Sequence, residues 1–230
     1  KEEFGRYAIA WLALVLAGLA YSMLATGLLT AIAEMEPRWL RFEHTLSDWR
    51  TALLSDRRTD QPPRLAIVLI DERTLRREAY SSPVDRGLLA RLVTRLDSLG
   101  AKAIGLDIVF YKPTEPAKDE ALLQAIRQAR ASVIMAAGDS RSGIDDDERA
   151  YQTRFLQRAG RPAGYVNLDR DIDDIPRRKL SPAPVPSFPK SFAEAVAEVD
   201  GRRDPDPGGR IAWLKRAENG TDAFFSVKAE

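Results

Sequence analysis

Acidic side chains and one arginine stand near the ends of two apolar runs, where polar groups can bind ligands. Asp71 directly follows the run 65–70, and Asp107 lies towards the end of the run 103–110. Ligands of parallel α/β sheets bind beyond the carboxyl ends of the strands. We therefore expect a small polar ligand or a divalent cation at this edge, held by Asp71, Ser82, Arg86, Asp107, Tyr111 and Asp119. A structural role stays open for each acid, because aspartates also cap helices and turns.

Two further acidic runs are weaker candidates for cation sites. Residues 169–174 resemble the start of a calcium loop, which needs glycine at its sixth position and glutamate at its twelfth. Asp174 and Leu180 occupy those positions, so we interpret the run as a solvated loop. Residues 145–148 are interpreted as a solvated turn or the start of a helix. No residue is assigned as a metal ligand.

Composition argues against most kinds of catalytic site. The chain has no cysteine, which excludes a thiolate nucleophile and a cysteine-type zinc site. His44 is its one histidine, and the sequence has no glycine-rich phosphate loop or nucleophile elbow. Aspartate can attack phosphate esters, so Asp71 is the candidate nucleophile of a tethered hydrolase or phosphatase. Arg73 stands where such an enzyme needs a second acid, and we assign no catalytic residue and no cofactor.

Alternating strands and helices must position these side chains. The β-branched run at 65–70 predicts a strand that is buried on both faces. Short links between successive elements predict an α/β fold with a mostly parallel sheet flanked by helices. The other predicted strands are 103–110, 132–137, 163–168 and 210–214, and the predicted helices are 85–99, 119–130 and 191–199.

The first residues predict a transmembrane helix ahead of this fold. Residues 7–33 contain no charged side chain, and such a run forms about 40 Å of helix against the roughly 30 Å of a bilayer core. The alternative is a cleaved signal peptide, since Ala31 and Ala33 resemble a cleavage site. A net charge of +1 gives no field that points to nucleic acid. The chain starts at Lys1 and stops at Glu230, and we expect it to be part of a longer polypeptide.

A second, amphipathic helix is predicted from Pro37 to about Ser55. Its apolar residues recur at spacings of three and four, as in a coiled-coil seam: Trp39, Phe42, Leu46, Trp49 and Leu53. One interpretation is a signalling stalk or dimer seam, in which Trp39, Phe42, Leu46 and Trp49 couple signal to membrane. The other is a helix that packs on its own domain.

Several short motifs follow one another in a distinctive order. SDWR at 47–50 precedes AIVLIDERTL at 66–75, then Pro83 and Arg86, LGAKAIGLDIVF at 99–110, GYVN at 164–167 and SFA at 191–193. Over roughly residues 40–227 this order resembles the type-2 CHASE (CHASE2) domain. That family is an extracellular sensor found at the amino end of bacterial adenylate or guanylate cyclases, histidine kinases and other signalling enzymes. The segment around Gly105 and Asp107 is the most specific part.

The chain departs from the family pattern at two places. The family usually has a tryptophan beside the proline at position 83, where this chain has Ser82 and Val84. It usually has aspartate-glycine before the later arginine, where this chain has Asp173 and Asp174. The expected organisation is an anchor at 1–36, a juxtamembrane helix and loop at 37–60, and a carboxy-terminally truncated sensor domain at 61–230.

The resemblance implies a sensory input domain on the periplasmic side of a bacterial inner membrane. Such a domain relays an external signal through membrane helices to a cytoplasmic cyclase or kinase and is not itself an enzyme. Its expected partners are the lipid bilayer, a second copy and an unidentified extracellular ligand or periplasmic protein, with no nucleic acid. A tethered hydrolase or phosphatase and a non-catalytic membrane partner subunit are the alternatives.

Overall fold

The computed structural model describes residues 2–35, 37–55, 64–181, 188–203, 209–211, 213, 215 and 220–229, with side chains in the first two helices at 11–32 and 40–54. Contacts between residues divide the chain into two compact units. One unit is Lys1–Asp56 together with Ile172–Ile175, and the other is Arg57–Asp171 together with Pro176–Glu230.

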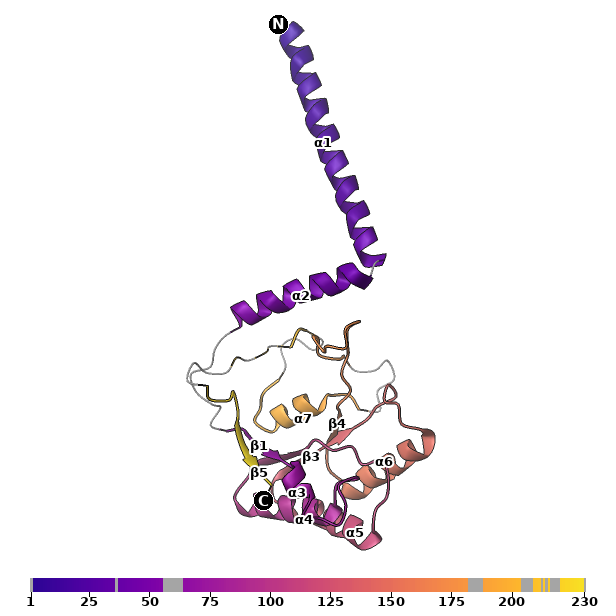
Figure 1. Ribbon diagram of the computed structural model, residues 1–230, viewed down its shortest axis with the longest axis vertical. Coiled ribbons are helices and arrows are strands. Elements are labelled where there is room, and N and C mark those ends of the chain that lie inside the picture. Colours follow the sequence, from indigo (N-terminus) through magenta and orange to yellow (C-terminus); the bar gives the residue numbers. More distant parts are fainter. Residues whose placement is uncertain are drawn as a thin grey trace. The chain divides into compact units, whose positions relative to one another are not determined.

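The first unit begins with one long helix, α1 (Glu2–Met35) (Figure 1). Within it, Trp11–Ile32 has a mean hydropathy of 2.0, which is apolar enough to cross a membrane. The large apolar side chains of this stretch are exposed all around the helix. A helix that is apolar on every side suits a lipid surrounding rather than a single buried face.

A second helix, α2 (Pro37–Leu54), follows almost at once, and the chain changes direction between the two (Figure 1). Its first residue is Pro37, and proline suits the first turn of a helix because that turn leaves its N–H groups unbonded in any case. The predicted juxtamembrane helix is therefore confirmed as a helix.

The second unit is built around a parallel sheet in the order β2 (Ala103–Leu106), β3 (Ser132–Ala137) and β4 (Ala163–Tyr165). Ala103 is in register with Ser132, and Met135 with Ala163. Helices α4 (Arg86–Ser98), α5 (Pro116–Gln128) and α6 (Asp146–Ala159) alternate with these strands. The predicted α/β fold with a parallel sheet is confirmed.

Apolar side chains of these helices meet one face of the sheet in a single core. The fully buried members include Leu89, Val93, Leu122, Leu123, Ile126, Val133, Met135 and Phe155. Helix α7 (Phe192–Glu198) lies on the other side of the sheet (Figure 1). It packs so closely that a Cβ on Gly164 would lie 2.5 Å from the backbone nitrogen of Phe192. A Cβ on Gly105 would lie 2.9 Å from the Phe192 ring, so both glycines are required by close packing.

One predicted strand lies in a different sheet from the one expected. Strand β1 (Ala66–Leu69) pairs in parallel with β5 (Phe225–Lys228), far away in sequence, and α3 (Glu72–Leu75) follows it. The prediction that this run is buried on both faces is wrong, because Ile67 and Leu69 are 39% and 46% exposed. An apolar run predicts a strand but not its neighbours. The sheet in which the strand pairs decides which elements cover its faces.

Several predicted boundaries also shift. The strand expected at 103–110 ends at Leu106, and the one expected at 163–168 ends at Tyr165. The strand expected at 210–214 lies partly outside the described residues. Within the described part, Arg210 forms an isolated β-bridge with Arg178. The acidic run at 145–148 is a helix start. Asp145 caps α6, and its side chain and that of Glu148 each accept a hydrogen bond from the other's backbone N–H.

Candidate functional site

Two of the expected ligand-binding residues meet at the N-terminal ends of α4 and α5. Arg86 is the first residue of α4, and its Nε lies 3.6 Å from Oδ1 of Asp119 in the first turn of α5. Both side chains are buried. Helices of a parallel α/β unit run opposite to its strands, so these N-termini lie at the carboxyl edge of the sheet, where the sequence places a site.

Asp119 also holds the loop that leads into its own helix. Its Oδ1 accepts a hydrogen bond from the Thr114 hydroxyl at 2.7 Å, and its Oδ2 accepts one from the Thr114 backbone N–H at 3.1 Å. The Tyr151 hydroxyl of α6 donates to the same Oδ2 at 3.2 Å. Burial, followed by the nearby charge of Asp119, raises the pKa of Tyr151 to about 12. Tyr151 therefore stays protonated and donates throughout the physiological range.

Arg86 lies against an aromatic face rather than in water. Its guanidinium carbon is 4.5 Å from the centroid of the Phe110 ring, and Phe110 stacks on Phe155 at 4.7 Å. Burial lowers the pKa of Arg86, and the charge of Asp119 opposes that change. The Arg86 Nε makes no hydrogen bond with any described residue, although it is fully buried. Of the groups at this edge, Arg86 therefore has hydrogen-bonding capacity that its surroundings leave unused.

The residues directly before Arg86 and Asp119 form a second ion pair. In this pair the acid, Asp85, stands at the start of α4 and the base, Lys118, belongs to α5. Asp85 caps α4 by accepting from the Leu88 backbone N–H at 3.0 Å, and its other carboxylate oxygen contacts the Lys118 ammonium. Burial alone would raise the pKa of Asp85, but the hydrogen bonds from Lys118 and Leu88 outweigh it, and the net pKa is lowered. Lys118 also lies 3.0 Å from Glu115, which accepts a hydrogen bond from the Tyr80 hydroxyl.

A third buried acid lies after β3. Asp139 is paired with Arg141, whose Nε lies 2.9 Å from Asp139 Oδ2, and its backbone N–H donates to Asn167 at 3.0 Å. Burial would raise the pKa of Asp139, and the hydrogen bonds from Arg141 outweigh it. Just before it, the buried Gln152 side chain bonds both backbone groups of Gly138, at 2.8 and 2.9 Å. The loop after β3 is thus fixed by its own neighbours.

Asp71 lies at a different place from the Arg86–Asp119 pair. It caps the short helix α3, and its Oδ1 accepts hydrogen bonds from the backbone N–H groups of Arg73 and Thr74 at 3.0 Å. Its Oδ2 lies 2.9 Å from the Lys228 ammonium of β5. These hydrogen bonds, that of the Thr74 backbone first, hold the pKa of Asp71 well below its usual range. An aspartate whose two oxygens are both occupied in this way acts as a cap.

The remaining expected residues are exposed. Asp107 and Ser82 are on the surface, and Tyr111 is 39% exposed beside Lys112, whose ammonium lies 5.4 Å from the ring centroid. Among the described residues, Arg86 and Asp119 are the two of the six that share an ion pair. Because β1 pairs with β5, the chain does not bring Asp71 into this arrangement through the three-stranded sheet.

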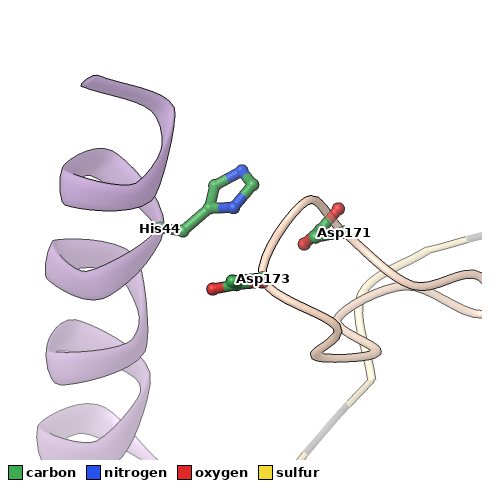
Figure 2. Close-up of side chains that lie close together, drawn as sticks. All are labelled: His44, Asp171 and Asp173. Carbon is green, nitrogen blue, oxygen red and sulfur yellow. The ribbon is translucent and has the colours of Figure 1, made fainter. Parts of the chain in front are cut away.

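In the first unit, His44 of α2 lies beside Asp173 of the segment Ile172–Ile175, whose carboxylate extends towards the helix (Figure 2). A ring nitrogen of His44 and a carboxylate oxygen of Asp173 lie within 4.8 Å of each other. Asp171, which Figure 2 also labels, belongs to the second unit, where its Oδ2 lies 3.0 Å from Arg177 Nη1. The acidic run at 169–174 therefore contains one acid with its own buried arginine.

Several residues of this network were not foreseen as site residues. They are Asp85, Phe110, Lys118, Arg141, Tyr151 and Gln152. Asp85 carries a readable signal, since an aspartate directly before a helical pattern is a cap. Tyr151 and Gln152 carry none, because they act from the second turn of a helix that the sequence shows only by its acidic start.

Three buried acids at this edge each contact a basic side chain. Asp85 pairs with Lys118, Asp119 with Arg86 and Asp139 with Arg141. The pKa values of Asp85 and Asp139 are lowered, and carboxylates with lowered pKa values are poor general acids. These ion pairs hold loops in place.

Comparison with known proteins adds one finding. A family model described as the CHASE2 domain matches residues 22–223. Searches of curated proteins and of solved structures found no match.

Proposed function

The chain belongs to the CHASE2 family of sensory domains, and we propose that it is the extracytoplasmic input domain of a membrane-bound bacterial signalling protein. The observation that carries the proposal is the family match over residues 22–223, which begins inside the apolar helix α1 and continues through the α/β unit. A sensor that is continuous with a membrane-length helix is in the right place to receive signals on one side and pass them to the other.

In this function α1 is the anchor, and residues 64–229 form the periplasmic domain. The extracellular character of the family supports the periplasmic side. The output enzyme is a cytoplasmic adenylate or guanylate cyclase or a histidine kinase, reached through the membrane helices. The domain itself performs no catalysis, in keeping with carboxylates that are matched one to one with cations.

The ligand site of this sensor is centred on Arg86 and Asp119. Arg86 is the buried cation with an unused donor, so a small polar ligand with an acceptor group fits it best. The exposed residues Ser82, Asp107 and Tyr111 extend the proposed site to neighbouring surfaces, whereas Asp71 serves as the cap of α3. Binding that reorients Arg86 would alter its contact with Asp119, and hence the loop that Thr114 and Asp119 hold together.

Signal coupling runs through α2, the segment that joins the domain to its anchor in sequence. Its coupling residues are Trp39, Phe42, Leu46 and Trp49; of these, the Trp39 side chain lies outside the described residues. The protein is further proposed to act as a homodimer, in which a ligand shifts an equilibrium between two arrangements of the two copies.

The experiment that tests this function uses the intact protein as its gene encodes it, in membranes. Cyclase activity and histidine autophosphorylation are measured for the wild type, for Phe42→Ser with Leu46→Ser, and for the matched control Thr45→Ser on the same helix. We expect the double variant to change the output at unchanged expression, while the control matches the wild type. Output equal to wild type in the double variant, or neither enzymatic activity in the wild type, would contradict the proposal.

A further inference from the structure

Helix α2 carries its apolar and polar residues on opposite sides. At 3.6 residues per turn, one face carries Phe42, Leu46, Trp49 and Leu53, called here the outward stripe. The opposite face carries Leu40, His44, Ser47 and Thr51. These two sets share no residue, so the burial of each can be compared directly.

The exposed face of α2 is its apolar one, which a water-soluble protein would be expected to bury. The outward stripe is mostly in the open, with Phe42 57% exposed, Leu46 55%, Trp49 69% and Leu53 74%. The four residues of the opposite face are half-buried. A helix packed on a soluble domain buries its apolar side, so the exposed stripe indicates that a further apolar phase covers it.

The position of α2 beside α1 points to the lipid surface as that phase. The apolar stretch of α1 ends at Ile32, and α2 begins at Pro37 after a change of chain direction (Figure 1). If α1 spans the bilayer, as the proposed function requires, the first turn of α2 lies at the level of the lipid headgroups. A helix of 18 residues, about 27 Å long, that turns away from α1 there lies along the membrane rather than through it.

The residue types in and around the stripe fit an interfacial helix. Tryptophan, phenylalanine and leucine are the residues that such helices bury at the headgroup level. Arg41 and Arg50 are exposed on either side of the stripe, within reach of lipid phosphates. A two-stranded coiled coil instead favours branched aliphatic residues and leucine at its seam, whereas Phe42 and Trp49 supply two of the four positions here.

We propose that the outward stripe of α2 lies in the headgroup region of the bilayer, so that α2 is a membrane-surface helix between the anchor and the sensor domain. This inference rests on the proposed function, because α1 must span the membrane for α2 to reach the surface. Signals then pass through a helix held in the plane of the membrane. Lipid contact replaces pairing with a second copy as the role of the stripe.

Residues 1–230 contain no cysteine, so a cysteine introduced at one of these positions is the only one among them and can be labelled singly. The full chain is placed in vesicles of phosphatidylcholine and phosphatidylglycerol, with a nitroxide label at one position at a time. Leu46→Cys and Leu53→Cys report on the stripe, Ser47→Cys and Thr51→Cys on the opposite face, and Leu19→Cys on α1. The measured quantity is the collision rate with oxygen, which partitions into lipid, relative to that with a water-soluble nickel complex.

We expect the oxygen-to-nickel ratio to be several-fold higher at Leu46 and Leu53 than at Ser47 and Thr51, and highest at Leu19. Stripe labels that are open to nickel while Leu19 is in lipid would overturn this inference and leave the anchor of the proposed function standing. Strong spin–spin broadening at Leu46 without oxygen access would overturn it in favour of a paired helix. A Leu19 label open to nickel would overturn both the inference and the membrane anchor of the proposed function.

Discussion

Arg86 and Asp119 face each other across the N-terminal ends of α4 and α5, with Arg86 Nε 3.6 Å from Asp119 Oδ1. The residue before each of them forms a second ion pair of reversed polarity, Asp85 with Lys118. Two helices are therefore joined twice at the edge of the sheet where ligands of this fold class bind. Any ligand that competes for Arg86 acts on the contact that holds these helices together.

Removing one partner of the Arg86–Asp119 pair is expected to lower the free energy of unfolding strongly. Arg86→Met leaves the Asp119 carboxylate buried without its cation, and removal of one partner of a buried pair costs about 3–5 kcal/mol of the free energy of unfolding. The double variant Arg86→Met with Asp119→Leu should recover most of that loss, because no buried charge is left alone. Urea unfolding of the detergent-solubilised chain, followed by near-ultraviolet circular dichroism, measures both changes.

An exposed ion pair on the same helix provides the matched control for this prediction. Arg91 lies 2.7 Å from Glu78, with the Arg91 side chain 64% exposed, so Arg91→Met should cost no more than about 1 kcal/mol. If Arg86→Met proves as mild as Arg91→Met, the Arg86–Asp119 pair is not a stabilising element of the fold.

The Asp85–Lys118 pair predicts a defined loss of stability in acid. The pKa of Asp85 is lowered in the folded chain, so its contribution is present above the ordinary aspartate pKa of about 4 and is lost as the pH falls through the lower, folded value. Asp85→Asn should therefore be less stable than the wild type at neutral pH, with the gap narrowing below about pH 4. Urea midpoints measured across this range decide the point, and a gap that widens in acid would refute it.

The raised pKa of Tyr151 predicts a loss of folding stability at alkaline pH. Its pKa is raised from 10.0 to about 12, so between these values the folded chain keeps a proton that the unfolded chain loses. Stability should accordingly fall as the pH rises through this interval, and fall less in Tyr151→Phe. Tyrosinate absorbance of the folded proteins should show one late-ionising tyrosine fewer in the variant than in the wild type. If the tyrosine missing from the variant is instead one that ionises near pH 10, the buried position of this hydroxyl is contradicted.

Close packing of α7 predicts different outcomes for two glycines. Gly164→Ala places a methyl group 2.5 Å from the Phe192 backbone, which must move, and overpacking of this kind costs about 1–3 kcal/mol. Gly143→Ala meets no atom within 4 Å and should leave the urea midpoint nearly unchanged. Equal midpoints for the two variants would mean that α7 does not pack on the sheet as described.

Many of the helices and strands of the second unit could be predicted from local sequence patterns. The strand at 132–137 and the helix at 85–99 carry complete periodic signals, and the structure places β3 at Ser132–Ala137 and α4 at Arg86–Ser98. The place of β1 could not be predicted in this way. Its partner is β5, more than a hundred residues later, and a long-range pairing leaves no mark in the residues of either strand.

The candidate site was predictable only in part, for a related reason. Arg86 and Asp119 could be placed together because each lies in the first turn of a helix at the same edge of one sheet. Asp71 also directly follows a predicted strand, but that strand, β1, belongs to the two-stranded sheet. The same sequence pattern therefore belongs to an aspartate that caps α3 and contacts Lys228. The reversed pair of Asp85 and Lys118 depends on the spacing between two helix axes, which no single segment encodes.

The measurement that tests the central claim most directly is the side of the membrane on which the α/β unit lies. In intact bacterial cells that produce the full protein, a membrane-impermeant maleimide is applied to Gln124→Cys on the exposed surface of α5 and, separately, to Glu3→Cys ahead of the apolar stretch. An extracytoplasmic sensor predicts labelling at position 124 in intact cells and labelling at position 3 only after permeabilisation. Labelling at position 3 in intact cells, with position 124 protected until permeabilisation, would contradict the account.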